Sequence, residues 1–102
     1  MKGRGRKLEY DIVYSKNFTE RDFPNLPKTI RSRITKAINE RLTTDPIKFG
    51  KPLRGRLKGY RRIRISDYRV IYTVNIAKHK VFVATAGHRE DVYSKMPLDL
   101  LL

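Results

Sequence analysis

Two short polar stretches of the sequence contain residue types that bind and cleave phosphate esters. RRIRISDYR spans residues 61–69 and is rich in arginine, and GHREDVY spans residues 87–93. Arginine keeps its proton at ordinary pH, so these side chains bind phosphate and stabilise charge on it but do not exchange protons. The nearby groups that do exchange protons are few: His88, Tyr93, Glu90 and Asp91.

This inventory suits the cleavage of RNA by its own 2′-hydroxyl group. The hydroxyl attacks the adjacent phosphodiester, which leaves a 2′,3′-cyclic phosphate and a free 5′-hydroxyl. The reaction needs a base, an acid and cationic stabilisation, but it needs no metal. No cluster of Asp and Glu accompanies the arginines, which argues against two-metal cleavage. We therefore expect neither a metal nor another cofactor.

Each candidate also has a plain structural interpretation. A lone histidine at the end of a strand more often packs or faces solvent than reacts, and Tyr93 is equally suited to covering a core. A row of arginines on one sheet face is often simply solvated. The residue types alone leave both interpretations open.

The composition places the chain among small basic proteins. It has 102 residues and a formal net charge of +14, which predicts an anionic partner: nucleic acid first, then an acidic protein, then an anionic membrane surface. Without cysteine it forms no disulfide and no thiolate metal site. No apolar run approaches the roughly 18 residues of a membrane span, and the start MKGRGRK is not followed by a signal-peptide core. We expect one cytoplasmic domain over 1–102, with 1–7 as a flexible basic tail.

The hydrophobic pattern predicts an α+β fold in which an antiparallel sheet packs on a pair of helices. A first strand is expected over 8–15, then a short helix capped by Ser15, then a longer helix over 27–43. Three further strands are expected as an antiparallel meander, over 60–66, 68–76 and 80–87. The order is β-α-α-β-β-β, and the short C-terminal segment PLDLLL is apolar at its end.

The positions of the turns decide which side chains share a face of the meander. With turns centred at Ser66-Asp67 and Lys78-His79, Arg64 lies opposite Arg69, and Arg69 lies opposite His88. One face is then apolar and packs on the longer helix, with Ile63, Ile65, Val70, Tyr72, Val74, Ile76, Val81 and Val83. The other face collects Arg62, Arg64, Arg69 and His88, beside Ile71, Ala84 and Ala86. Neither dipeptide is a strong hairpin turn, and a loop of odd length would move Arg64 to the opposite face.

Arginines directly across a hairpin repel each other, so the row indicates an external anion such as phosphate. The segment before it adds to the positive charge, because residues 51–64 contain seven basic residues and no acidic one. We expect six side chains to bind RNA phosphates: Arg54, Arg56, Lys58, Arg61, Arg62 and Arg64.

Three segments of the sequence carry a resemblance to a known family. LRGRLKGYRRIRISDYRVIYTV and VFVATAGHREDVYSKM resemble the RelE/ParE superfamily of type II toxin–antitoxin toxins, and LPKTIRSRITKAINERLTTDP is similar to its second helix. The resemblance covers Leu8 to Met96 and implies the RelE-like fold. It also implies a toxin that enters the ribosomal A site, contacts rRNA and cuts mRNA, and a cognate antitoxin that wraps a disordered segment around the basic surface.

The resemblance implies a catalytic set, which here is Arg64, Arg69, His88, Arg89 and Tyr93. In it, Arg62 and Arg64 match two basic residues that bind the substrate's phosphates, and Arg69 matches the arginine that stabilises the transition state. Both strand positions are arginine here, so no lysine on that strand shuttles protons. The acid and base roles then pass to His88 and Tyr93, without a division between them.

Two other functions remain open. A ParE-like toxin poisons DNA gyrase without cutting RNA and shares this fold, but such toxins generally lack the arginine, histidine and tyrosine set. A non-catalytic basic RNA-binding protein accounts for the net charge, but it leaves the clustering of polar residues at the end of the sheet unexplained.

Overall fold

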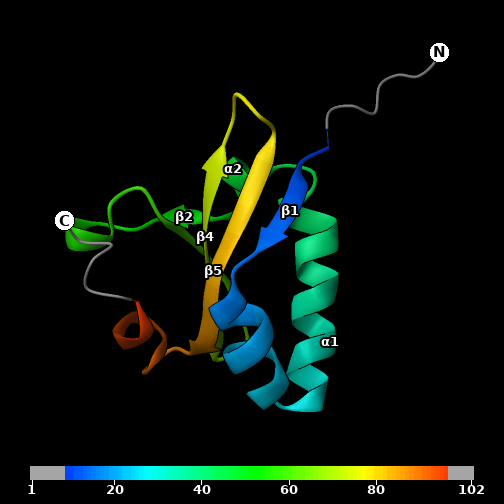
Figure 1. The fold of residues 1–102 in the computed structure, drawn as a ribbon, viewed down its shortest axis with the longest axis vertical. Coiled ribbons are helices and arrows are strands. Elements are labelled where there is room, and N and C mark those ends of the chain that lie inside the picture. Colours follow the sequence, from blue (N-terminus) through cyan, green and yellow to red (C-terminus); the bar gives the residue numbers. More distant parts are fainter. Residues whose placement is uncertain (1–8, 97–102) are drawn as a thin grey trace.

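The computed structural model describes residues 9–96 of the chain. The basic segment 1–7 and the PLDLLL segment at 97–102 lie outside the described residues. The predicted strands and helices occur in the predicted order. Figure 1 shows the two long helical segments against one side of a twisted sheet.

The helical layer consists of two units joined by a short turn. The first unit comprises η2 (Asn17–Asp22) and η3 (Phe23–Asn25). The Phe18 amide donates to Ser15 Oγ at 3.0 Å, as expected where Ser15 precedes a helix. The second unit is α1 (Lys28–Ala37), which continues as η4 (Ile38–Leu42) with unbroken helical backbone angles. Its buried stripe follows the apolar spacing that predicts the helix: Ile30, Ile34, Ala37, Ile38 and Leu42.

The sheet has five strands in the order β1-β5-β4-β3-β2. Their bounds are β1 Asp11–Tyr14, β2 Lys51–Pro52, β3 Arg61–Ile65, β4 Tyr68–Asn75 and β5 Lys80–His88. The sequence pattern misses β2 and the single-turn helix α2 (Pro46–Phe49) that precedes it.

The expectation of a wholly antiparallel sheet is wrong in one respect, because β1 pairs with β5 in parallel. The helical layer returns the chain so that β3 runs in the same direction as β1. The two hairpins that follow reverse the chain twice, so β5 also runs parallel to β1. The α+β class and the order of the elements are confirmed.

The two hairpins differ in how well the sequence predicts their register. The first turn lies at Ser66-Asp67 and pairs Arg64 with Arg69, as expected. The second turn has four residues rather than two, so Asn75 pairs with Lys80. A β-bulge at Ala84 then shifts the register again, because Ile71 pairs with Thr85 while Tyr72 pairs with Val83.

These shifts correct three of the face assignments. Ile76 falls in the turn and is 60% exposed instead of buried. Ala86 lies in the core on the helix side instead of beside the arginines. His88 pairs with Tyr68, whereas the sequence places it opposite Arg69. The other residues of the predicted apolar face lie in the core or pack against it.

The sheet carries a second, smaller apolar cluster on its other face. Leu57, Ile71, Ala84, Val92 and Met96 form this cluster, with Leu53, Tyr60 and Tyr93 packed against it. Two short helical turns contribute to it, η5 (Gly55–Leu57) and η6 (Val92–Lys95). The cluster fastens the basic loop and the C-terminal turn beside the arginine face.

Candidate active site

Alternate residues of β3 place two arginines on the face that bears the second apolar cluster. Arg64 pairs with Arg69 of β4, and Arg62 pairs with Ile71, so the three guanidinium groups project from the same side of the sheet. The buried Ile63 and Ile65 alternate with them and pack under the helices. The same alternation that builds the core therefore gathers the arginines.

Arg69 lies at the centre of this group and is 8% exposed. Its Nη1 donates to the carbonyl of Tyr68 at 3.1 Å and to that of Ser66 at 3.4 Å. Burial lowers the pKa of Arg69, and repulsion from Arg64, Arg62 and Arg89 lowers it further, while Tyr93 opposes the shift. The guanidinium remains charged, but its charged form is destabilised until an anion binds.

Arg89 and Tyr93 reach the group from the chain that follows β5. The Arg89 amide donates to the carbonyl of Asp67 at 2.7 Å, which fastens the end of β5 to the β3–β4 turn. Tyr93 is carried by η6, whose neighbours Val92 and Met96 are buried in the second cluster. Both side chains interact electrostatically with the buried guanidinium of Arg69.

The charge of this site is unbalanced. Among residues 9–96, no salt bridge joins any of the four arginines to a carboxylate; the ion pairs found there all involve Asp22. Arg69 and the three arginines that repel it, together with the half-buried Tyr93, suit a phosphodiester, whose negative charge grows as the bond is attacked. We call Arg62, Arg64, Arg69, Arg89 and Tyr93 the arginine site.

His88 does not share the face of the arginine site. It pairs with Tyr68, and the two rings meet edge to face with centroids 5.5 Å apart. Tyr68 packs against the helix-side core, so the pair lies on the opposite face from Arg64 and Arg69. His88 Nδ1 also accepts a hydrogen bond from the Glu90 amide at 3.3 Å. The cross-strand contact with Arg69, which raised His88 as a candidate, is therefore absent.

Arg61 also lies apart from the arginine site. It pairs with Tyr72 on the helix-side face, and its Nη2 donates to the carbonyls of Ile47 at 2.7 Å and Gly50 at 3.1 Å. These bonds close the loop that contains α2 onto the edge of the sheet. Its position is that of a structural arginine.

The remaining basic candidates, Arg54, Arg56 and Lys58, are exposed side chains on the loop around η5. Leu57 anchors this loop in the second apolar cluster, which Tyr93 also contacts. The loop thus flanks the arginine site without entering it.

Sequence reasoning missed a buried acid, Asp22, which is 2% exposed. Thr85 Oγ1 donates to it at 2.6 Å, and Arg21 and Lys95 form ion pairs with it at 2.7 Å and 3.2 Å. Asp22 stands four residues after Phe18, on the buried side of η2. A carboxylate at an apolar helical position was the available signal, because such a charge needs partners.

Two kinds of feature are absent from residues 9–96. The described residues contain no group of three or more His, Cys, Asp and Glu that could hold a metal ion. No helix among them is long and apolar enough to cross a membrane.

Comparisons with known proteins match almost the whole described chain. The family model of the ParE toxin of the type II toxin–antitoxin system, parDE, matches residues 12–93. The toxin RelE of Mycobacterium tuberculosis (strain ATCC 25618 / H37Rv) is 32% identical over 77 residues, or 76% of this chain and 79% of that protein. The mRNA interferase toxin RelE of Escherichia coli (strain K12) is 36% identical over 90 residues, or 82% and 94%.

Solved structures support the same grouping. The toxin–antitoxin complex RelBE2 from Mycobacterium tuberculosis contains a chain that superposes with a TM-score of 0.74 at 27% identity. The match covers 79% of this chain and 99% of that chain. The overall fold is thus shared with a chain of a toxin–antitoxin complex.

Proposed function

Because this chain belongs to the RelE/ParE superfamily of type II toxin–antitoxin toxins, we propose that it is a ribosome-dependent mRNA endonuclease neutralised by a cognate antitoxin. Its site of action is the ribosomal A site in the cytoplasm, where it contacts mRNA and rRNA. The observation that carries the proposal is the arginine site, in which the buried Arg69 interacts with three other arginines and with Tyr93, and no salt bridge among the described residues neutralises the arginines.

The proposed reaction is a transesterification that needs no metal. The substrate's 2′-oxygen forms a bond to phosphorus, the bond to the 5′-oxygen breaks, and that oxygen takes up a proton. Arg62 and Arg64 hold the phosphate, and Arg69 stabilises the added negative charge. Arg89 contributes further positive charge at the opposite side of the site.

Tyr93 is the proposed proton-transferring group. Its phenol has an exchangeable proton and interacts electrostatically with the buried guanidinium of Arg69, and a positioned phenol can act as a general acid or base. His88 remains the alternative, but its place on the other face and its bond from Glu90 make it the weaker candidate.

Inhibition of DNA gyrase is the second candidate function, because the matching family model describes ParE toxins. A gyrase poison of the same fold would have no need of the arginine site. The relatives named for mRNA interferase activity favour RNA as the target.

The test uses purified ribosomes programmed with a defined mRNA and primer extension across the A site. Wild type is expected to cut, and the ends should be a 2′,3′-cyclic phosphate and a 5′-hydroxyl. A 2′-deoxy nucleotide at the cut position should block the reaction. Products with a 5′-phosphate would contradict the transesterification. Intact mRNA together with inhibition of gyrase supercoiling would establish the second function instead.

Two substitutions locate the chemistry, Arg69→Ala and Tyr93→Phe. Each removes a group from the transition state, so each is expected to slow cleavage by about 100-fold or more. Lys80→Ala is the matched control, because it removes one positive charge at the far end of β5. Wild-type rates in both site variants would show that the assignment of residues is wrong.

A further inference from the structure

The outer edge of β5 is left open where β1 ends. Tyr14 pairs with Val83, and the strand stops there, so the backbone from Ala84 onward has no neighbouring strand on that side. Side chains fill the gap instead. Ser15 Oγ donates to the Ala84 carbonyl at 2.6 Å, and the Ala86 amide donates to Asp22 Oδ2 at 3.2 Å. Lys95 Nζ donates to the Ala86 carbonyl at 2.8 Å.

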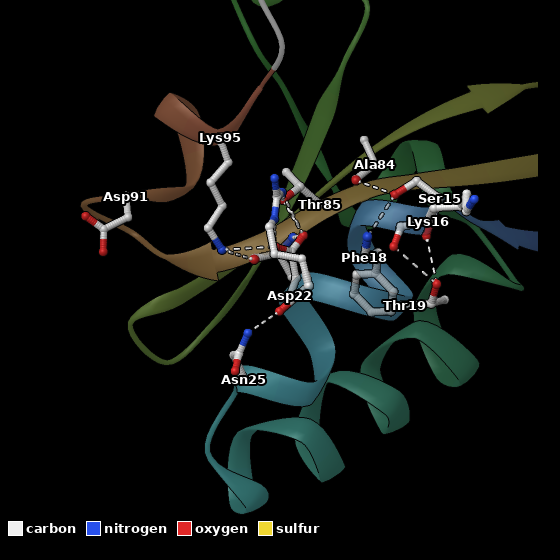
Figure 2. Close-up of polar contacts among 12 residues, drawn as sticks. Ser15, Lys16, Phe18, Thr19, Asp22, Asn25, Ala84, Thr85, Asp91 and Lys95 are labelled. Carbon is white, nitrogen blue, oxygen red and sulfur yellow. Dashed lines mark hydrogen bonds and ion pairs between the residues drawn. The ribbon is translucent and has the colours of Figure 1, made fainter.

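Asp22 joins three elements at this edge (Figure 2). It lies at the end of η2, it receives hydrogen bonds from Thr85 and Ala86 of β5, and it forms an ion pair with Lys95 of η6 at 3.2 Å. Burial raises the pKa of Asp22, but bonds from Arg21, Thr85 and the Ala86 amide, with attraction from Lys95, outweigh burial and lower it. The carboxylate is therefore a stable buried anion with all its partners in place.

Lys95 reaches Asp22 by crossing Gly87. A Cβ atom at position 87 would lie 2.6 Å from Lys95 Nζ and 3.2 Å from its Cε, so glycine leaves the space that the lysine occupies. Gly87 pairs directly with Arg69 in the β4–β5 ladder. Lys95 therefore lies over Gly87, the residue of β5 that pairs with the buried Arg69.

Tyr93 stands two residues before Lys95 in the same helical turn, η6. Val92 and Met96 hold the apolar side of this turn in the second apolar cluster, and Lys95 is its polar anchor to β5. The backbone that carries the proton-transferring phenol is therefore fastened to the sheet through Lys95 and Asp22.

We propose that Asp22 is a positioning residue for the cleavage reaction, which holds Lys95 and thereby keeps Tyr93 in the arginine site. Asp22 touches no substrate, and its effect passes through η6. This inference rests on the proposed function and adds to it a residue from the opposite end of the chain.

The first test compares Asp22→Asn and Lys95→Met in single-turnover cleavage at saturating ribosomes. Each removes one end of the ion pair, and each is expected to slow cleavage by about 10- to 100-fold, because small misplacements of a reacting group are costly. Arg21→Gln is the matched control: it removes the other ion-pair partner of Asp22 but leaves Lys95 in place, and it should cleave within twofold of wild type. Wild-type cleavage by folded Asp22→Asn and Lys95→Met would overturn the proposal.

A double-variant comparison separates positioning from general loss of stability. If Asp22 acts through Tyr93, Asp22→Asn should change the residual rate of Tyr93→Phe by less than twofold. Independent effects would instead multiply. Multiplied losses would show that Asp22 acts by another route.

Hydrogen–deuterium exchange provides a readout that does not depend on activity. In Asp22→Asn and Lys95→Met, amides of residues 88–96 should exchange faster by a larger factor than amides of α1, whose exchange should change only as much as global stability does. If the wild-type protein leaves mRNA intact but the two variants still exchange faster in η6, Asp22 and Lys95 hold η6 and the proposed function is wrong. If exchange in η6 is unchanged, Asp22 and Lys95 do not hold η6, and the inference is overturned whatever the cleavage result.

Discussion

Arg69 is a buried cation whose environment opposes its charge. It is 8% exposed, its hydrogen bonds go only to main-chain carbonyls, and its charged neighbours include Arg62, Arg64 and Arg89. Buried charges are ordinarily paired. An unpaired one is costly to the free protein and becomes favourable when a phosphate supplies the missing negative charge.

Arg69→Met should therefore stabilise the protein while it abolishes cleavage. Removing a desolvated and repelled charge, with the volume kept, is expected to raise the free energy of unfolding by about 1 kcal/mol. Urea denaturation of the free protein measures this increase in the free energy of unfolding. The increase should be smaller at high salt, where the repulsion between the arginines is screened. A clear loss of stability would show that the carbonyl hydrogen bonds of Arg69 outweigh the repulsion.

Asp22 should make the stability of the fold depend on pH in the acidic range. Its pKa is lowered in the folded state, so its contribution is present above the unfolded value of about 3.9 and is lost as the pH falls through the folded value. The charged groups that face it are Arg21 and Lys95.

Asp22→Asn is accordingly expected to cost about 3 kcal/mol at pH 7, because it removes the negative charge that pairs with Arg21 and Lys95 and leaves Lys95 only its bond to the Ala86 carbonyl. The gap between the variant and wild type should narrow below about pH 4. Urea titrations at pH 7 and pH 3 measure both values. A gap that stays constant over this range would show that the carboxylate's charge is not what stabilises the fold.

At the scale of elements, a close contact fixes the loop of α2 and β2 to the sheet. Tyr72 is fully buried, its hydroxyl donates to the Pro46 carbonyl at 2.6 Å, and burial raises its pKa to about 12. The backbone of Gly50 passes against this hydroxyl, where a Cβ atom would overlap it.

Gly50→Ala is expected to destabilise the protein by about 2 kcal/mol, since neither the buried ring nor the strand has room to move. Tyr72→Phe removes the hydroxyl, so adding it to Gly50→Ala should recover part of the loss. Thermal unfolding of the two single variants and the double variant measures the coupling. Additive losses would mean that the two residues do not compete for the same space.

The same scale explains what the sequence could and could not predict. The apolar stripe of α1 and the first hairpin follow from periodicity, which is why Arg64 and Arg69 are placed correctly. The second hairpin has a four-residue turn and a bulge at Ala84, and neither leaves a clear sequence signal. The bulge carries His88 to the other face, because one extra residue reverses the alternation of side chains beyond it. Asp22 escaped notice because its partners are 63 and 73 residues away along the chain.

For the whole molecule, a net charge of +14 predicts that RNA binding falls steeply with salt. Arg62→Ala and Arg64→Ala should each weaken binding of a short single-stranded RNA and reduce the slope of log affinity against log salt by about 0.7, one phosphate contact. Lys78→Ala, in the exposed β4–β5 turn, should leave the slope unchanged. Fluorescence anisotropy at several salt concentrations measures the slopes. Equal reductions in all three variants would indicate a diffuse field rather than a site.

The pairing of β1 with β5 has a consequence for the order in which the protein is made. β1 emerges from the ribosome early, but the strand beside it is the last strand of the described sheet to be synthesised, and Ser15 and Asp22 wait for partners 63 to 73 residues later. Contacts this distant form late in folding. The arginine site includes Arg89 and Tyr93, which follow β5, so it is assembled only after this last strand of the described sheet has been made.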